Sequence, residues 1–467
     1  MLSHFPYKKI FCIGIGGIGV SGLAELLHQH GYQVIGSDLQ DNDQTKYLES
    51  LGINIFYSHQ TSHIQDVDLV VYSSAISKTN PEFLEAQRKN ITLMSRGELL
   101  AKIMQAKNNI IVAGTHGKTT TTSLISYMLE QSNCNPSFMI GGVLSDRSST
   151  VRLGENAFFV AESDESDKSF LLLSPTVAVI TNIDADHLEA YDHSFENLKK
   201  SFIAFSKKIP SHGFVIACID NSIVREILPN ISCKILTYGE NKRADYQLMH
   251  FKQHGLQSDF VIQTPVQQSI QVQLNLSGLH NALNSVAAFI VAQIYQLPTT
   301  TVLSAFRQFP GIGRRFSFHG KIKVPGGSAL LFDDYGHHPR EIQMILNAAK
   351  AAWENCRVIL VFQPHRYTRT RDLMLDFVQV LKMADQLVLT EVYAASENKI
   401  DGADGKALLR ALQAAGVNNA LFIEKLTELP LILQRILQPN DIVILQGAGD
   451  IVTMAEVLTK ECYDHVK

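Results

Sequence analysis

The chain has 467 residues, of which 45% are hydrophobic and 18% charged, with a formal net charge of −4 at pH 7. This length exceeds what one hydrophobic core can organise, so we expect about three domains of an ordinary globular protein. The near-neutral charge gives no electrostatic reason to expect nucleic acid or a membrane surface as a partner, and no apolar run reaches the roughly 20 residues that span a bilayer.

The first residues lack the cleavage pattern of a signal peptide and lead directly into a strand-like segment. The six cysteines are scattered without a C-x-x-C pair, so we expect reduced thiols. These two observations predict a cytoplasmic protein.

A glycine-rich turn lies between the first predicted strand and a helix over 23–30. A second strand over 33–36 is followed by Asp38, close to the Rossmann spacing of about 20 residues after the glycines. The pattern predicts a diphosphate held at a helix N-terminus, and its direct interpretation is NAD binding with Asp38 on a ribose hydroxyl. The glycines of this turn are Gly14, Gly16, Gly17 and Gly19.

Further βα units follow, with strands near 54–57, 69–72 and 92–94. The polar segment after the middle strand lies at the carboxyl edge of the predicted sheet, where open α/β sheets bind ligands. A polar loop without a ligand is the alternative. This segment contains Ser73, Ser74 and Ala75, and a helix over 96–104 then leaves the domain.

The most informative stretch begins at Ile110 and reads Ile-Ile-Val-Ala-Gly-Thr-His-Gly-Lys-Thr-Thr. An apolar run over 110–113 predicts a buried strand, and apolar spacing over 123–129 predicts a helix. Between them, a glycine-rich turn can hold polyphosphate, because backbone N–H groups and the helix N-terminus point at the anion. The lysine adds a positive charge, and a threonine hydroxyl can hold Mg²⁺. The loop residues are Gly114, Thr115, His116, Gly117, Lys118, Thr119 and Thr120.

This loop departs from the usual pattern G-x-x-x-x-G-K-[ST], since Val112 stands where the first glycine is expected. An ordinary strand-to-helix turn with a solvated lysine is the alternative interpretation. We favour the phosphate loop because strand, Gly-Lys-Thr and helix occur in this order.

Polar ligands follow two further predicted strands. One strand opens into Glu162, and the next ends in Asn182, Asp184, Asp186 and His187. Such groups downstream of a phosphate loop are what a Mg²⁺–nucleotide site requires, with Glu162 at the ion and His187 at a second ion. The alternative is a helix cap formed by Asp184 and Asp186, with Glu162 in solvent.

Residues 245–276 alternate short apolar and polar stretches, which predicts antiparallel β structure inserted into the α/β region. A helix that follows carries His280 and Asn281 near its start, where the pair serves a ligand or simply caps the helix. The next glycine-punctuated loop carries Arg314 and Arg315, which suit bidentate contacts with phosphate, and we expect a domain hinge there.

The C-terminal third begins with a strand that ends in Asp333 and Asp334, followed by Tyr335, His337 and His338. Zinc binding is an alternative for this segment. It is disfavoured because adjacent histidines cannot easily converge on one ion, and no cysteine or third histidine lies nearby in sequence.

A strand that begins at Arg357 feeds a loop with Arg366, Arg369 and Arg371. Arginines at a strand end, in a chain without a basic balance, predict binding of a small carboxylate or phosphate. Strands over 386–391, 420–423 and 441–446 complete a parallel α/β unit.

Taken in order, these motifs resemble those of the Mur ligases, ATP-dependent enzymes that build the peptide of bacterial cell-wall precursors. The resemblance extends over essentially the whole chain. The motifs that carry it are Gly114-Thr-His-Gly-Lys-Thr-Thr, Thr181-Asn-Ile-Asp-Ala-Asp-His, Leu279-His-Asn-Ala, Gly313-Arg-Arg-Phe, Asp333-Asp-Tyr-Gly-His-His-Pro and Gln363-Pro-His-Arg-Tyr-Thr-Arg-Thr.

The resemblance implies an α/β chain of three domains. Residues 1–107 would form a Rossmann-like domain that holds a UDP-sugar, so the N-terminal glycines would serve that ligand and not NAD. Residues 108–315 would form a central P-loop ATPase-like domain with a small antiparallel β insertion. Residues 316–467 would form a Rossmann-like α/β domain that contacts the amino acid and ATP.

Within the family, the chain looks most like the members that add L-alanine to UDP-N-acetylmuramate. Such a member would use ATP and Mg²⁺, with Mn²⁺ as an alternative ion, to phosphorylate the lactyl carboxylate, and the amine of L-alanine would attack the acyl phosphate. A ligase that reattaches a recycled murein tripeptide to the same sugar is the alternative, although we would not expect its sequence to contain the segment His365 to Thr370. A monomer or homodimer without nucleic-acid or membrane partners is expected.

The resemblance also implies roles for individual residues. Lys118, His187 and Arg315 would be catalytic. ATP would contact the phosphate loop together with Asn281, Arg315 and Asp334, and the metal would contact Thr119, Glu162 and His187. The UDP-sugar would contact Gly14, Gly16, Gly17, Gly19, Asp38, Ser73, Ser74, Ala75 and Arg96. L-alanine would contact Tyr335, His337, Arg366 and Arg369.

One position departs from the sister ligases that add later amino acids. Those enzymes use a carbamylated lysine as a metal ligand some fifteen residues after the histidine that matches His187. Here the position is Phe202, with Lys199 and Lys200 nearby, so no carbamate is predicted.

Overall fold

The computed structural model describes residues 5–73, 75–104, 108–142, 150–155, 157–163, 165, 168–186, 188–395 and 397–464. The chain divides into two compact units. The first comprises Met1–His250, Phe260–Gln273 and Leu283–Phe309. The second comprises Phe251–Asp259, Leu274–Ala282 and Pro310–Lys467.

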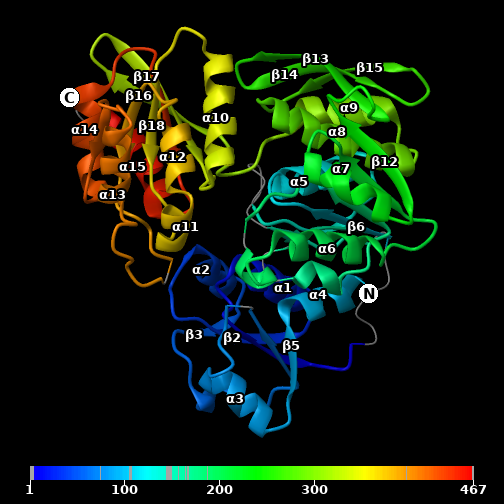
Figure 1. Cartoon of the computed structure of the whole chain (residues 1–467). Helices are drawn as coiled ribbons and strands as arrows, with labels where there is room; N and C mark the ends of the chain where they lie inside the picture. Colours follow the sequence, from blue (N-terminus) through cyan, green and yellow to red (C-terminus); the bar gives the residue numbers. More distant parts are fainter. Residues whose placement is uncertain are drawn as a thin grey trace. The chain divides into compact units, whose positions relative to one another are not determined.

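The N-terminal sheet is parallel throughout, with the strand order β3-β2-β1-β4-β5 among the described residues (Figure 1). Side chains alternate across it, as the period of a strand requires. Ile10 and Cys12 pack in the core beneath α1 and α4, whereas Phe11 and Ile13 pack against Phe83 of α3. The strands are β1 Lys9–Ile13, β2 Gln33–Ser37, β3 Asn54–Phe56, β4 Leu69–Tyr72 and β5 Thr92–Ser95. The helices are α1 Ile18–Gln29, α2 Asp43–Ser50, α3 Pro81–Arg88 and α4 Arg96–Met104.

The central sheet is mixed, with the order β15-β14-β13-β12-β11-β10-β6-β9-β7-β8 in the part of the chain that is described. The pairs from β12 to β7 are parallel, and β8 is antiparallel to β7. The strands are β6 Asn108–Ala113, β7 Ser137–Met139, β8 Val151–Arg152, β9 Phe158–Glu162, β10 Val177–Ile180, β11 Phe214–Cys218, β12 Lys234–Gly239, β13 Tyr246–His254, β14 Gln257–Gln263 and β15 Ser269–Leu274. The helices are α5 Lys118–Gln131, α6 Phe195–Ser206, α7 Ser222–Ile227, α8 Leu279–Ile294 and α9 Thr299–Gln308.

The predicted insertion is present as β13 to β15. Only Gly255 and Leu256 separate β13 from β14, and a short turn in which Thr264 N–H donates to the Gln268 carbonyl (2.9 Å) separates β14 from β15. Such short connections join antiparallel neighbours, because parallel strands need a crossover of a dozen residues or more.

The C-terminal sheet has the order β16-β17-β21-β18-β19-β20 among the described strands. All its pairs are parallel except β16 with β17, an antiparallel edge that the sequence analysis did not predict. Phe332 of β17 faces α10 and α12, while Leu331 faces α15. The strands are β16 Ser317–Val324, β17 Gly327–Asp334, β18 Val358–Phe362, β19 Gln386–Leu389, β20 Ala420–Phe422 and β21 Ile442–Gln446. The helices are α10 Pro339–Ala352, α11 Tyr367–Asp372, α12 Met374–Leu381, α13 Gly405–Ala414, α14 Leu429–Ile436 and α15 Met454–Asp464.

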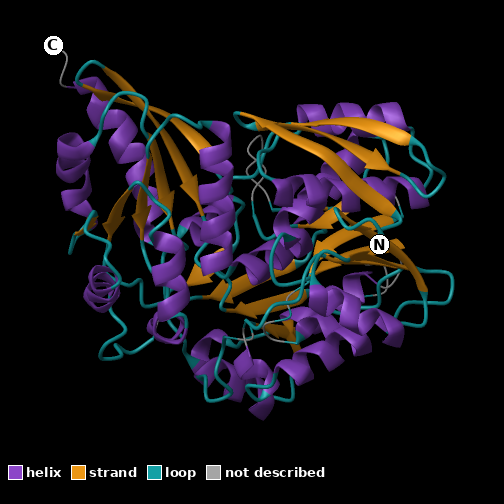
Figure 2. Cartoon of the chain, turned by 45° about the horizontal axis from the view of Figure 1, so that its top comes forward, coloured by secondary structure: helices purple, strands orange, loops and turns teal. Residues whose placement is uncertain are grey.

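The predicted α/β class is confirmed, and helices cover the sheets (Figure 2). Two helix starts differ from the predictions. The helix after the phosphate loop begins at Lys118 and not near residue 123, and the first helix begins at Ile18 and not at Leu23. The first turn of α5 is Lys118 followed by buried threonines, which carry no apolar periodicity. In α1, Gly19, Ser21 and Gly22 interrupt the apolar pattern before Leu23.

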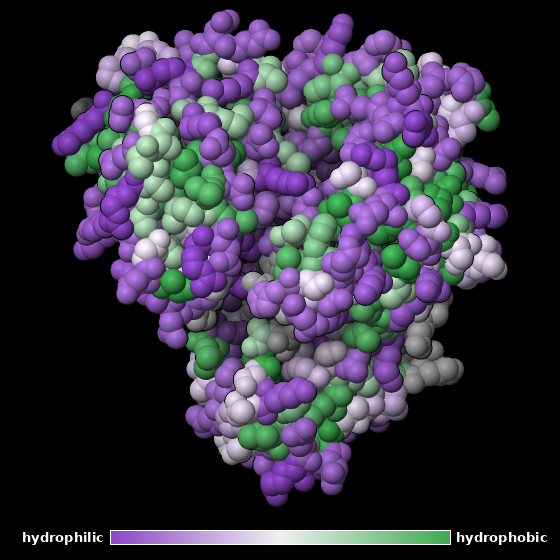
Figure 3. Space-filling view, in the orientation of Figure 1, coloured by the Kyte–Doolittle hydropathy of each residue, from purple (hydrophilic) through white to green (hydrophobic). Residues whose placement is uncertain are grey.

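The surface drawn in Figure 3 is covered mainly by hydrophilic side chains, with hydrophobic residues interspersed. Large exposed apolar side chains such as Val266, Leu375 and Leu431 lie on different elements. No helix within the described ranges is both long and apolar enough to cross a bilayer.

An ion pair joins the two strands of the C-terminal edge. His319 Nε2 lies 3.1 Å from Asp333 Oδ1, and the Asp333 side chain is only 3% exposed. The Asp333 carboxylate beside it raises the pKa of His319 above its usual value, while burial acts in the opposite direction. Because the folded-state pKa exceeds that of the unfolded chain, the pair stabilises the fold fully below the unfolded-state pKa, and this contribution is lost as pH rises through the folded-state pKa.

We therefore predict that His319→Ala lowers the free energy of unfolding by about 1–3 kcal/mol at pH 6, because it leaves a buried carboxylate without its partner. The difference in the free energy of unfolding between the unmodified protein and this variant narrows as the pH is raised to 9. Denaturant unfolding across this pH range measures this difference.

The matched control is His254→Ala. His254 lies 3.8 Å from Asp259, but their side chains are 68% and 46% exposed, so solvent screens the pair and a small effect is expected. The prediction is contradicted if the difference in the free energy of unfolding between the unmodified protein and His319→Ala stays constant or widens with rising pH.

Candidate active site

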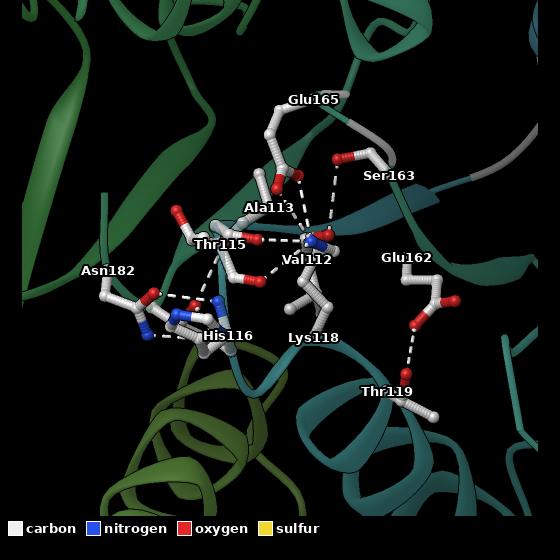
Figure 4. Close-up of polar contacts among 12 residues, drawn as sticks. Val112, Ala113, Thr115, His116, Lys118, Thr119, Glu162, Ser163, Glu165 and Asn182 are labelled. Atoms are coloured by element: carbon white, nitrogen blue, oxygen red, sulfur yellow. Dashed lines mark hydrogen bonds and ion pairs between the residues drawn. The ribbon is translucent and has the colours of Figure 1, made fainter. Parts of the chain in front are cut away.

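The loop between β6 and α5 has the tight geometry of a phosphate loop (Figure 4). Gly114 and Gly117 have φ of +134° and +82°, which side chains other than glycine rarely adopt. A Cβ at Gly114 would lie 2.2 Å from Thr181 Oγ1, and one at Gly117 would lie 2.8 Å from Asn284 Oδ1. Gly117 precedes the first turn of α5 without a side-chain cap from the described residues, which leaves backbone N–H groups for an anion.

The loop is anchored to the end of β10. Asn182 Oδ1 accepts the backbone N–H of His116 (2.8 Å), and Asn182 Nδ2 donates to the His116 carbonyl (2.9 Å). Thr181 Oγ1 donates to the same carbonyl (2.6 Å), and Figure 4 shows Asn182 beside His116. These bonds fix the backbone of the loop. A site that binds its ligand through backbone N–H groups requires such a fixed backbone.

Asp184 also contacts this loop. Its backbone N–H donates to Thr115 Oγ1 (2.9 Å), and its Oδ2 lies 3.5 Å from His116 Nε2. The interpretation of Asp184 as part of a helix cap therefore misses its contacts with the loop, and the next α-helix, α6, is capped by Ser194.

Lys118 does not extend into solvent. Its Nζ lies 2.9 Å from both carboxylate oxygens of Glu165 and donates to the carbonyls of Gly114 (2.6 Å) and Thr115 (3.2 Å). Its side chain is 19% exposed and that of Glu165 is 3% exposed. The ammonium is therefore held over its own loop, where a phosphate group would meet it (Figure 4).

Two of the predicted metal ligands lie together. Thr119 Oγ1 donates to Glu162 Oε2 (2.8 Å), and a Cβ at Gly141 would lie 1.7 Å from Glu162 Oε1, so only glycine leaves room for this carboxylate. Hydroxyl and carboxylate oxygens suit Mg²⁺, which takes few protein ligands and keeps waters and phosphates. No cluster of three or more His, Cys, Asp or Glu fit for a metal occurs among the described residues. His187, the third predicted ligand, lies outside them.

The glycine-rich turn of the N-terminal domain and Asp38 lie together at the carboxyl edge of the sheet. Asp38 Oδ2 accepts the backbone N–H of Gly16 (2.8 Å), and Gly14 has a φ of +75°. Gly17 precedes α1 without a side-chain cap from the described part of the chain, so this helix N-terminus also suits an anion.

Ser73 and Arg96, also expected at this site, make local contacts. Ser73 Oγ accepts the backbone N–H of Ala75 (3.3 Å), and Ser74 lies outside the described residues. Arg96 lies against Gly19, where a Cβ would meet its Cδ at 2.7 Å, and its guanidinium donates to Ser169 Oγ (3.0 Å).

In the second unit, Asp334 is buried beneath a set of donors. Its carboxylate accepts the backbone N–H groups of Gly336 (2.7 Å) and Phe316 (3.0 Å) and the amide of Gln446 (2.6 Å). Burial raises the pKa of Asp334 to about 6, although Arg315 and the Gly336 amide act in the opposite direction. The carboxylate therefore organises the backbone on both sides of it, at Phe316 after the loop with Arg314 and Arg315 and at Gly336.

The predicted amino-acid residues form one connected cluster in this unit. The rings of Tyr335 and His337 are 5.6 Å apart, and those of His337 and His365 are 5.3 Å apart. Arg369 Nη1 lies 3.3 Å from His365 Nδ1. Burial, together with His337, Arg369, Arg366 and Arg314, lowers the pKa of His365 to about 3. Burial is the main cause of the lowered pKa, and the arginines beside the neutral imidazole give the cluster positive charge that suits an anion.

Arg315 lies beside this cluster, 5.3 Å from the Tyr335 ring. Burial and the nearby Arg315 lower the pKa of His280 to about 4. Asn281 donates from Nδ2 to the Ser277 carbonyl (2.8 Å), so it supports the start of α8. The two residues thus contribute to the local structure, and the capping alternative accounts for part of the role of Asn281.

The adjacent histidines His337 and His338 make different contacts, and Phe202 is a core residue. His338 accepts the Arg340 N–H (3.3 Å) as the cap of α10, whereas His337 faces His365, so the adjacent histidines serve different contacts. Phe202 is fully buried, with its ring 5.2 Å from that of Phe170. It fills the core at the position where the sister ligases carry their lysine.

Sequence reasoning missed three residues of these clusters, namely Glu165, His365 and Tyr393. Glu165 belongs to the acidic segment after β9, and His365 belongs to the arginine-rich motif. Both could have been singled out as charged or titratable residues at strand ends. The ring of Tyr393, which stacks on His365 at 5.7 Å, lies in a segment without such a motif.

The chain is similar to known proteins along nearly its whole length. Three family models match successive parts of the chain: the Mur ligase family catalytic domain at residues 9–108, the Mur ligase middle domain at 112–292 and the Mur ligase glutamate ligase domain at 314–449. A protein of Coxiella burnetii (strain Dugway 5J108-111) named UDP-N-acetylmuramate–L-alanine ligase is 46% identical over 454 residues, which cover 97% of this chain and 98% of that protein.

Two solved structures are also similar. The UDP-N-acetylmuramate–alanine ligase of Thermotoga maritima matches with a TM-score of 0.83 and 30% identity, covering 97% of this chain and 98% of that chain. A murein peptide ligase of Psychrobacter arcticus matches with a TM-score of 0.72 and 23% identity, covering 98% and 100%, and this likeness shows the fold alone. The extent of these matches confirms the resemblance found in the sequence: the chain belongs to the Mur ligase family.

Proposed function

We propose that this protein joins L-alanine to the lactyl carboxylate of UDP-N-acetylmuramate and converts ATP to ADP and phosphate in the same reaction. The observation that carries the proposal is 46% identity, along 97% of the chain, to a UDP-N-acetylmuramate–L-alanine ligase. The phosphate loop and the cation-lined cluster support it, because the reaction needs a site for a polyphosphate and a site for a small carboxylate.

In this proposal the phosphate loop binds ATP. The backbone N–H groups at the start of α5 and the Lys118 ammonium hold the β- and γ-phosphates and stabilise the charge on the γ-phosphoryl group as it transfers to the lactyl carboxylate. The product of this step is an acyl phosphate. No covalent enzyme nucleophile is required, since the reaction depends on charge neutralisation and positioning.

Thr119 and Glu162 would hold Mg²⁺, with His187 at a second ion, and Mn²⁺ is the alternative metal. The ion supplies neutralisation of phosphate charge when bound. The chain's own contribution is to place a hydroxyl and a carboxylate together beside the phosphate loop, in a space that Gly141 keeps open.

Tyr335, His337, Arg366 and Arg369 would bind L-alanine, with the arginines on its carboxylate. The neutral amine then attacks the acyl carbon, a tetrahedral intermediate forms, and its collapse releases phosphate and leaves the amide. Arg315, Asn281 and Asp334 are proposed to contact ATP, and we propose Arg315 as a catalytic residue that stabilises the transferring group.

The N-terminal domain would bind the UDP portion of the sugar. Gly14, Gly16, Gly17 and Gly19 would approach the diphosphate, and Asp38 would contact the uridine. Ser73, Ser74, Ala75 and Arg96 would complete the pocket. We further propose the domain limits 1–107, 108–315 and 316–467, a cytoplasmic location, and a monomer or homodimer.

The ligase that reattaches a recycled murein tripeptide to UDP-N-acetylmuramate is the second candidate. The murein peptide ligase of Psychrobacter arcticus supports only the fold, at 23% identity. Burial of Arg369 near His365 favours a small substrate, since Arg369 is 9% exposed. Measuring phosphate release with the tripeptide and, separately, with L-alanine decides between the two candidate functions.

We predict that purified protein releases phosphate from ATP only when UDP-N-acetylmuramate and L-alanine are both present. Lys118→Ala lowers kcat by roughly 10²–10³-fold, because a charge that stabilises the transferring phosphoryl group is lost. The control Lys46→Ala removes a lysine of α2 whose side chain is 62% exposed, and it leaves the rate unchanged. Release with the tripeptide but not with L-alanine assigns the second candidate, and an active Lys118→Ala enzyme contradicts the role of the loop.

A further prediction concerns Arg369. Arg369→Ala raises the KM for L-alanine by about 10–100-fold, since a hydrogen bond to a charged group is worth about 1.5–3 kcal/mol and 1.4 kcal/mol is tenfold. The KM for ATP changes much less. Arg371→Ala, on the same helix, serves as the control because the Arg371 side chain is 55% exposed and pairs with Asp372. Equal effects of the two variants on the KM for L-alanine rule out the assignment.

A further inference from the structure

We propose that Glu165 is an internal competitor of the nucleotide: it neutralises Lys118 while the phosphate loop is empty, and the phosphates of the nucleotide displace it. The inference rests on the proposed function in taking this loop as the ATP site. It assigns to Glu165 a positioning role, exerted through Lys118, that limits nucleotide affinity.

The first observation is the geometry of the pair. Both carboxylate oxygens of Glu165 lie 2.9 Å from Lys118 Nζ, and the loop carbonyls of Gly114 and Thr115 accept from the same atom at 2.6 and 3.2 Å. An ammonium has three N–H donors, which these acceptors already engage. A phosphate oxygen can therefore bind Lys118 fully only by taking the place of an existing acceptor.

The second observation is where Glu165 is fixed. The hydroxyl of Tyr191, a fully buried residue, donates to the Glu165 carbonyl (2.5 Å), and the Lys168 N–H donates to the same carbonyl (3.2 Å). The Lys168 ammonium also lies 5.0 Å from the centre of the Tyr191 ring. These contacts hold the backbone of Glu165 and leave its carboxylate tied to Lys118, so displacement requires rotation of a side chain and no change of the loop's anchor.

Charge decides which acceptor leaves. The loop carbonyls are neutral and belong to the turn that surrounds the phosphate, whereas Glu165 is an anion that would face the anionic phosphate at short range in a nearly buried place. Two anions that share one ammonium repel each other, so the carboxylate is the acceptor that gives way. In the empty loop the same carboxylate is stabilising, because an unpaired buried ammonium is costly.

Two effects of opposite sign follow from this. Glu165→Gln keeps the size of the side chain but removes its charge. The nucleotide-free variant should unfold at a lower temperature, because the ion pair is lost. The same variant should bind nucleotide more tightly, by roughly tenfold, because part of the protein is no longer held in a competing state.

The experiment measures ADP binding to the full chain by calorimetry, without sugar or amino acid, once with Mg²⁺ and once with EDTA, together with the thermal unfolding of each nucleotide-free protein. Glu165→Gln is expected to lower the Kd under both conditions and to lower the Tm. Glu165→Asp, which keeps the charge on a side chain shorter by one methylene, is expected to give intermediate values, and it replaces Glu165→Gln if the latter fails to fold.

The matched control is Glu130→Gln. Glu130 lies near the far end of α5 from Lys118, pairs with Arg152, and has a side chain only 7% exposed. This variant should lower the Tm and leave the Kd for ADP unchanged.

An unchanged or higher Kd for Glu165→Gln, with a lower Tm, means that Glu165 is merely structural and overturns the inference. Weaker binding only in the presence of Mg²⁺ identifies Glu165 as a metal ligand and also overturns it. Failure of the unmodified protein to bind ADP under either condition contradicts the proposed function of the loop instead, so the two failures can be told apart.

Discussion

The site depends first on the close approach between the phosphate loop and the end of β10. Gly114 can lie against Thr181 only because it lacks a Cβ, and Asn182 then binds both backbone groups of His116. This packing fixes the loop's backbone before any ligand arrives. The electrostatic contribution of backbone N–H groups is largest when they need no reorganisation, so a fixed turn suits the phosphate binding that we propose for this loop.

Around this loop, charge is balanced locally. Lys118 lies against Glu165, which follows β9, and Thr119 lies against Glu162, the last residue of β9, so a cation and a hydroxyl of one helix turn each face a carboxylate. The second unit shows the opposite arrangement. There burial, together with the nearby His337, Arg369, Arg366 and Arg314, lowers the pKa of His365, and the arginines supply positive charge that suits a carboxylate.

Much of the fold could be predicted from the sequence, because its strands are short apolar runs that end at glycines or carboxylates. The strands β1 and β6 are followed by Gly14 and Gly114, and β9 and β17 end in Glu162 and Asp334. The residues at these strand ends belong to the candidate sites. The start of α5 could not be predicted from periodicity, since Thr119 to Thr122 are buried hydroxyl residues in a helix. Their burial results from packing in the central domain, which no local pattern records.

The sequence indicated most residues of the candidate sites, but it did not indicate which of them contact one another. The motifs place Lys118 and Glu165 far apart in sequence, and only the pairing of β6 with β9 brings the two ends together. The same holds for Tyr393, which reaches His365 because their segments lie side by side. The edge strand β16 was missed because Ser317–Val324 is mostly polar or partly exposed and gives a weak strand signal.

The central claim is that the lactyl carboxylate of UDP-N-acetylmuramate is activated as an acyl phosphate before L-alanine attacks. Isotope transfer tests this most directly: the sugar is labelled with ¹⁸O in that carboxylate, the reaction is run with ATP and L-alanine, and the released phosphate is analysed by mass spectrometry. The account predicts one ¹⁸O atom in each phosphate, because the carboxylate oxygen leaves with the phosphoryl group. Unlabelled phosphate, or release of pyrophosphate and AMP, would contradict it.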